Sequence, residues 1–266
     1  MAEVHQEREG ILRGGEFPLL FRAGPGESAR SRHRPGAALN PWWFAPPLTL
    51  AAGYLYWRYV WFFRNPERSS PPGDNIVSPA DGTVVYVRLV KGHHEVMTIK
   101  QGVSARLTDI IKEDLDYPKV SIGIFMSPFN VHYNRIPLAG RVAAIRHHPP
   151  EPANLAMTAM HWRTILKWPP LHRHSRHIIQ NERLVTRVES TYKGERFPYY
   201  VVQIAGKSVN GIDSYVQPGA EVDKGCIFGM IRIGSQVDLV APFLPGMEIK
   251  TRPGAKVRAG ETVLLA

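Results

Sequence analysis

The sequence predicts a mainly β fold of the α+β class: a β-rich barrel or sandwich with few helices. From residue 74 onward, short runs rich in Val, Ile and Tyr recur, and several of them alternate apolar with polar residues. Glycines and prolines, 23 of each in 266 residues, interrupt these runs at short intervals, as turns between paired strands require. The expected strands are residues 83–90, 95–100, 120–125, 141–146, 183–190 and 199–206.

Three regions follow one another along the chain. Residues 1–40 are polar and rich in Gly and Pro, which is typical of a mobile arm. Residues 41–63 are apolar with a single arginine, about the ~20 residues that span a bilayer. Pro46 and Pro47 interrupt this stretch, and Trp and Tyr crowd its ends as they do at membrane interfaces. We expect a membrane anchor, either a short span or an interfacial hairpin, with a buried core helix as the alternative; residues 64–266 would form the catalytic domain.

Charge and cysteine content narrow the function classes. The chain carries 33 Lys and Arg against 23 Asp and Glu, a net charge of +10, which suits a polyanionic partner. The apolar segment favours an anionic membrane over nucleic acid, at the cytoplasmic face of the cell membrane. Cys226 is the only cysteine, so neither an intrachain disulfide nor a Cys-based metal site can form. The histidines between residues 147 and 180 lack metal-ligand spacing, and no metal is expected.

A weak internal repeat supports the prediction that strands of the β-rich region pair as β-hairpins. "PGAEVDKGCIFGMI" (218–231) and "PGAKVRAGETVLLA" (253–266) share P-G-A-x-V-x-x-G. Such hairpins resemble those of biotinyl/lipoyl-type domains, so one alternative is a non-enzymatic, membrane-tethered β-domain. A carrier of that type needs a modifiable lysine, usually after a methionine, and the sequence has no Met-Lys pair.

Residues 147–180 break the β pattern. The stretch is bounded by prolines and rich in His and Arg, and Trp162, Ile165 and Leu166 share one face of a helix. Two readings stay open: this segment presses onto lipid headgroups, or it caps the barrel as a surface helical hairpin.

Three short stretches together contain the groups that activate a hydroxyl. "SPADG" (78–82) supplies Asp81, "FMSPFNVHYNRIP" (125–137) supplies His132, and Ser235 follows Gly234 in an apolar run. Alone, each has a structural explanation: a turn, a core histidine, a bulge in a strand. Together they offer a nucleophile, a base and a carboxylate that orients the base.

These stretches, with "FFRNPER" (62–68) and "NERL" (181–184), occur in an order that resembles the phosphatidylserine decarboxylases of the short, compact type. The resemblance implies a proenzyme that cuts itself at Gly234–Ser235. The chains 1–234 and 235–266 would stay together as a heterodimer. Ser235 would become a pyruvoyl group, the covalent cofactor with which phosphatidylserine is converted to phosphatidylethanolamine and CO₂. His132 would activate Ser235 and later return a proton to the substrate carbon, and Asp81 would orient His132.

Two departures from the family pattern leave questions open. The cut reads Gly-Ser-Gln where longer members have Gly-Ser-Thr, and Arg135 stands in the place of a second histidine. Arginine is not a base near neutral pH. His132 would therefore serve both in self-cleavage and in decarboxylation, or His147 or His148 would assist it. Arg135 and Asn134 are expected to bind the lipid's phosphate or carboxylate. Whether the lipid is ester-linked or an ether-linked, archaeal-type serine lipid stays open, as does a homodimer.

Overall fold

The computed structural model describes residues 40–91, 96–99, 103–106, 111, 118–173, 175–207, 211–232 and 234–266. Nearly all of the predicted arm, residues 1–40, lies outside this description. The chain divides into two compact units, residues 1–46 and residues 47–266, and everything described below from residue 47 onward belongs to the second.

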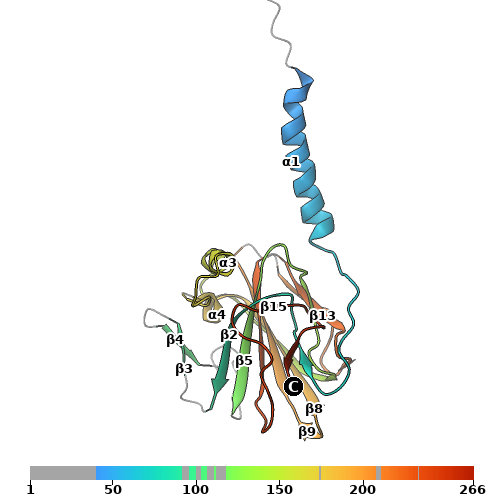
Figure 1. The fold of residues 1–266 in the computed structure, drawn as a ribbon, viewed down its shortest axis with the longest axis vertical. Coiled ribbons are helices and arrows are strands. Elements are labelled where there is room, and N and C mark those ends of the chain that lie inside the picture. Colours follow the sequence, from blue (N-terminus) through green and yellow to red (C-terminus); the bar gives the residue numbers. More distant parts are fainter. Residues whose placement is uncertain are drawn as a thin grey trace, which may run out of the picture. The chain divides into compact units, whose positions relative to one another are not determined.

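One nine-stranded antiparallel sheet dominates the fold and curls on itself (Figure 1). In sheet order its strands are β12 (Glu221–Val222), β7 (Gly140–His148), β8 (Arg183–Tyr192), β10 (Tyr199–Ala205), β14 (Ser235–Pro242), β5 (Lys119–Met126), β2 (Gly82–Val90) and β15 (Lys256–Val257), with β9 (Glu195–Arg196) paired to β8. Five of the six predicted strands lie in this sheet. The sixth, 95–100, contains β3 (Val96–Ile99), and its end residues lie outside the described residues. The predicted β-rich fold with few helices is confirmed.

Three smaller sheets complete the β structure of the described residues. They are β11 (Ile212–Ser214) with β13 (Ile227–Ile231) and β6 (Tyr133–Arg135), β1 (Ile76–Val77) with β16 (Val263–Leu265), and β3 with β4 (Val103–Arg106). The pairing of β6 with β13 matters most for function. It brings the residues after His132 beside the strand that leads to Ser235.

The large sheet buries side chains on both faces. Because successive strand residues point to opposite faces, Val237 and Leu239 of β14 enter one apolar core, whereas Val240 enters the other. The second core also contains Met160 and Ile178, so the short helices of the 147–180 segment cover that face of the sheet. A strand buried on both faces reads as a nearly continuous apolar run, as β10 (YYVVQIA) does.

The internal repeat folds as a repeat. Gly225 and Gly260, equivalent positions of its two copies, have φ of +84° and +75°, where glycine is favoured. The two turns touch, since a Cβ on Gly260 would lie 3.5 Å from the Cα of Gly225. A Cβ on Gly225 would clash with the Ser70 hydroxyl, and a Cβ on Gly260 would lie 3.0 Å from Cδ of Arg135, so both turns lack room for a side chain.

The helices with both ends in the described ranges are few and short. They are η1 (Pro41–Phe44), α1 (Ala45–Tyr56), the π-helical η2 (Trp57–Trp61), α3 (Thr158–Ile165) and α4 (His177–Gln180). Pro46 and Pro47 do not break the apolar segment, because they lie in the first turn of α1, where a missing N–H removes no hydrogen bond. No residue of α1 is buried. No helix in the described ranges is long and apolar enough to cross a membrane.

Candidate active site

Ser235 is the first residue of the central strand β14. It pairs with Ala205 of β10 on one side and Met126 of β5 on the other. The serine is fully buried, and its Oγ donates a hydrogen bond to the Met126 sulfur at 3.4 Å. Gly234 therefore precedes the strand instead of interrupting it. Its φ of +62° lies in the left-handed region, which glycine adopts without strain.

His132 is a buried, uncharged imidazole. Its ring packs on Phe62 with the ring centroids 4.2 Å apart, and neither ring nitrogen has a well-aligned hydrogen-bond partner in the described part of the chain. Burial lowers the pKa of His132 to about 4; the Asn130 backbone opposes that shift and the charge of Arg64 adds to it. At neutral pH the ring is thus a base with a lone pair free to accept a proton.

A buried amide pair connects the His132 segment to Ser235. Asn134 Nδ2 lies 3.7 Å from the same Met126 sulfur that Ser235 contacts, and Gln203 Nε2 donates to Asn134 Oδ1 at 2.7 Å. The Gln203 Oε1 atom has no partner among the described residues. Gln203 is not among the predicted site residues, although a signal for it is present in the sequence: it is the only amide in the apolar run "YYVVQIA".

Asp81 forms its contacts with Arg68. Its carboxylate accepts from the Arg68 guanidinium at 3.0 Å and from the backbone N–H of Ala259 at 2.7 Å. No hydrogen bond joins Asp81 to His132 in the part of the chain that the structure describes. The structure therefore does not show the carboxylate orienting the imidazole; it shows Asp81 fixing the segment that carries Arg68.

Residues 62–68 form a strap that connects the three stretches. Phe62 packs on His132, Arg64 donates to the carbonyl of Phe129, and Arg68 binds both Asp81 and Glu261. Phe62 is fully buried, so the end of the apolar segment 41–63 belongs to the packing of the site. In the sequence, the motif of residues 62–68 contributed to the family resemblance, but no role could be assigned to it, because the residues it contacts lie far away along the chain.

Arg135 is held by protein groups. Its guanidinium donates to the carbonyl of Gly225 at 2.8 Å, to Asn65 Oδ1 at 2.8 Å and to the carbonyl of Pro66 at 3.4 Å. Burial lowers the pKa of Arg135. In this arrangement the arginine that replaces the second family histidine ties the strap to a turn of the repeat; binding of a lipid anion by Arg135 and Asn134 stays a prediction.

The other departure, Gln236 after Ser235, has a local explanation. On the opposite face of β14, Gln236 Oε1 accepts a hydrogen bond from His177 Nε2 at 3.0 Å, and Gln236 Nε2 donates to Asp238 at 2.7 Å. Tyr86 donates to the same carboxylate at 2.7 Å. All four side chains are buried. Burial raises the pKa of Asp238 to about 6 and lowers that of His177 to about 4. This chain of hydrogen bonds holds the start of β14 in place.

His147 and His148 are poorly placed to help. Both lie on β7, and the order β7-β8-β10-β14 puts two strands between them and Ser235. At ~4.8 Å per strand, this separates the strand axes by about 14 Å. His147 contacts Glu182 at 2.9 Å. The sheet order therefore argues against His147 and His148 as helpers at Ser235, and His132 as the base stays a prediction.

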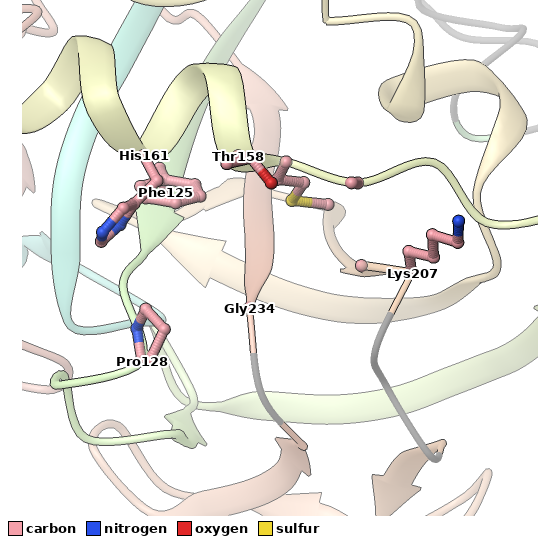
Figure 2. A pocket seen from close by; sticks show the side chains of 9 residues that line it. Phe125, Pro128, Thr158, His161, Lys207 and Gly234 are labelled. Carbon is pink, nitrogen blue, oxygen red and sulfur yellow. The ribbon is translucent and has the colours of Figure 1, made fainter. Parts of the chain in front are cut away.

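A small pocket lies beside the Gly234–Ser235 bond. It has a volume of about 200 Å³, and its lining includes Thr158 and His161 of α3 together with Phe125, Lys207 and Gly234 (Figure 2). The Nδ1 atom of His161 is buried without a partner among the described residues. His161 and Lys207 are site residues that the sequence did not single out, since nothing local distinguishes them.

The Arg68–Asp81 pair allows a stability prediction. Arg68→Met should lower the free energy of unfolding by about 3–5 kcal/mol, because it leaves the Asp81 carboxylate buried without its charged partner. The matched control is Arg258→Met, which removes a 74%-exposed arginine 3.7 Å from Glu261 and should cost at most about 1 kcal/mol. Urea unfolding of a single-chain Ser235→Ala background measures both. Equal losses in the two variants would contradict the strap's role.

Comparisons with known proteins agree with the resemblance. The family model described as phosphatidylserine decarboxylase matches residues 55–265. A phosphatidylserine decarboxylase proenzyme of Chlorobaculum tepidum is 33% identical over 222 residues, covering 81% of this chain and 80% of the relative. One from Streptomyces coelicolor is 34% identical, covering 82% and 74%. A Methanopyrus kandleri protein, provisionally named archaetidylserine decarboxylase proenzyme, is 34% identical, covering 86% and 91%.

Proposed function

This chain belongs to the phosphatidylserine decarboxylase family, and we propose that it becomes active by cutting itself between Gly234 and Ser235. It is a carbon–carbon lyase that converts phosphatidylserine to phosphatidylethanolamine and CO₂. One observation carries the proposal for the site: a buried serine begins the central strand, directly after a glycine in the left-handed conformation that lines an open pocket.

The self-cleavage begins with the Ser235 hydroxyl. His132, neutral at pH 7, takes the hydroxyl proton as Oγ attacks the Gly234 carbonyl carbon, and the amide becomes an ester as the amine of residue 235 is released. Loss of the Cα proton of residue 235 then expels the Gly234 carboxylate and leaves a dehydroalanine. Water replaces its nitrogen, ammonia leaves, and the N-terminus becomes a pyruvoyl group. Gly234 favours the first step because it has no Cβ to obstruct the approach.

The surroundings of Ser235 fit a group formed at that position. The unpartnered Oε1 of Gln203, two residues along the strand from the Ser235 partner Ala205, and the unpartnered nitrogens of His132 offer polar contacts that the described residues leave unused. The pyruvoyl group supplies an electron-accepting carbonyl for the loss of CO₂. In this proposal His132 delivers a proton to the substrate carbon, and the serine headgroup enters the pocket of about 200 Å³ that Gly234, Thr158 and Lys207 help to line.

The two chains should remain one protein after the cut. The short chain, residues 235–266, carries β14, β15 and β16. β14 lies between β10 and β5, and β15 and β16 pair with β2 and β1. Departure of the short chain would expose the apolar cores on both faces of the sheet, which is strongly unfavourable.

Membrane association is part of the same proposal. α1 carries Leu50 and Tyr54 with 75% and 59% of their surfaces exposed, and Trp42 and Trp43 before it are 77% and 74% exposed. Apolar surface on this scale needs an apolar partner, and a phospholipid substrate brings one. The net charge of +10 favours an anionic leaflet. We therefore place the protein at the cell membrane, at its cytoplasmic face.

An intact mass of the purified protein tests self-cleavage. Under denaturing conditions we expect two masses, one for residues 1–234 and one for the 32 residues from 235 to 266. The short chain should be lighter than its serine form by one ammonia, and Edman degradation of it should fail because a ketone replaces the amine. Active protein that is a single chain with serine at 235 would contradict the proposal.

An ether-linked serine lipid is the second candidate substrate. The Methanopyrus kandleri relative favours it, because its name refers to the ether-linked archaeal lipid. The ester-linked lipid is better supported, since the Chlorobaculum tepidum and Streptomyces coelicolor relatives are both named for it. Turnover of matched ester and ether substrates distinguishes the two.

A further inference from the structure

Helix α3 presents an apolar face that nothing in the described chain covers. Trp162, Ile165 and Leu166 are 56%, 54% and 64% exposed, and Trp168 just beyond the helix is 62% exposed. The other side of the helix is fixed in place, since Met160 and Thr164 are buried. This outer face is the helical face that the sequence predicted, and it does not enter the core.

A basic cavity adjoins this face. The cavity measures about 740 Å³ and lies between β2, the turn before β15 and the chain that follows α3. Its lining includes four cationic side chains, Arg88, Lys167, Arg252 and Lys256, and no described Asp or Glu. None of the four forms an ion pair with a described carboxylate. Lys256 donates to Thr83, and Arg88 contacts His172.

The same helix borders the candidate active site. Thr158 and His161 line the pocket beside Gly234, and Figure 2 shows both on α3, across the pocket from Gly234. α3 thus has exposed apolar side chains on its outer side, the pocket along its inner side, and, beyond its C-terminal end, a cavity whose cations lack a carboxylate partner among the described residues. Apolar residues with tryptophan, bordered by Lys and Arg, are the pattern of a surface that lies in a membrane interface.

We propose that the outer face of α3 and the basic cavity form one docking surface for an anionic phospholipid bilayer. Trp162, Ile165, Leu166 and Trp168 enter the interface, and the cavity receives headgroup phosphates. Docking here holds the pocket at the membrane surface, so that a lipid headgroup reaches Ser235 without the lipid leaving the bilayer completely. This use of the surface rests on the proposed function; the docking itself does not.

An environment-sensitive label tests docking directly. In the full-length chain with Cys226→Ser, Ile165→Cys is labelled with the fluorophore NBD, and Tyr215→Cys, an exposed position directly after β11, is the matched control. With vesicles of mixed phosphatidylglycerol and phosphatidylcholine, emission at residue 165 should shift to the blue and rise severalfold, and residue 215 should not respond. Pure phosphatidylcholine, high salt, or Lys167→Glu with Arg252→Glu should weaken the response.

The label reports insertion at residue 165 itself, so attachment through residues 41–63 cannot imitate it. No response at residue 165, or an equal response at residue 215, would overturn the proposal. So would a silent label together with a change of oligomeric state in Ile165→Ser/Leu166→Ser protein without lipid, because the surface would then bind a second copy of the chain.

Turnover separates docking from chemistry. Ile165→Ser/Leu166→Ser protein should decarboxylate phosphatidylserine in vesicles about tenfold more slowly, and should keep its rate on a short-chain, monomeric phosphatidylserine. Equal rates on vesicles for the variant and the unmodified protein would contradict the role of the surface in substrate access. If the unmodified protein turned over neither substrate, the proposed function would fail while the label still reported docking.

Discussion

Ser235→Ala should leave the protein as one chain of 266 residues without decarboxylase activity. Without the hydroxyl, nothing attacks the Gly234 carbonyl, and alanine has no β-leaving group to form a pyruvoyl. The fold should persist, because within the described residues the hydroxyl makes one hydrogen bond, 3.4 Å long, to the Met126 sulfur, and β14 keeps both of its neighbours. Mass spectrometry and a thin-layer assay of phosphatidylethanolamine measure both results.

Two further serine variants sharpen this test. Ser235→Cys should cut slowly, since a thiol can make the first attack but leaves differently in the second step. Ser190→Ala on β8 makes the same deletion of a hydroxyl in the same sheet and should cut and turn over normally. Ser235→Ala protein that matures and decarboxylates would remove Ser235 from the mechanism.

His132→Ala should reduce decarboxylation by about 10²–10⁴-fold, the usual contribution of a positioned acid–base group, and should slow self-cleavage. With a pKa of about 4, the imidazole is already neutral at pH 6–8. The rate of self-cleavage should therefore not rise through pH 6.5, as it would for an ordinary histidine, and should fall only as the pH drops toward 4 and the base becomes protonated. Time courses of the purified Ser235-containing proenzyme across pH give both quantities.

His147→Ala is the matched control for that variant. His147 lies on β7, paired with Glu182, and its loss should change neither maturation nor turnover. Normal maturation and normal turnover in His132→Ala protein would exclude His132 as the base. A wild-type rate that titrates near pH 6.5 would mean that the acting base is a different, solvated group.

The sequence alone determined the β-rich fold and the chemical types at the site. Strand positions follow from alternation and β-branched content, which are local properties, and the six predicted strands accordingly coincide with strands of the structure. The Gly-Ser pair, the histidine and the ordered motifs are likewise local, so the sequence alone suffices to propose Ser235 and His132 as site residues. The repeat at 218–231 and 253–266 was readable for the same reason.

Only the tertiary structure decided which groups meet. Arg68 reaches Glu261 across 193 residues, and Asp81 reaches the Ala259 amide across 178, so no local pattern could assign Asp81 to the strap instead of the imidazole. The exposure of the α3 face was equally undecided, because a helical apolar stripe looks the same whether it meets a core or a membrane. The spacing of residues along the chain determines which side chains share one face of a helix or strand. What that face contacts depends on how segments far apart in the sequence come together, so its function can be read only from the tertiary structure.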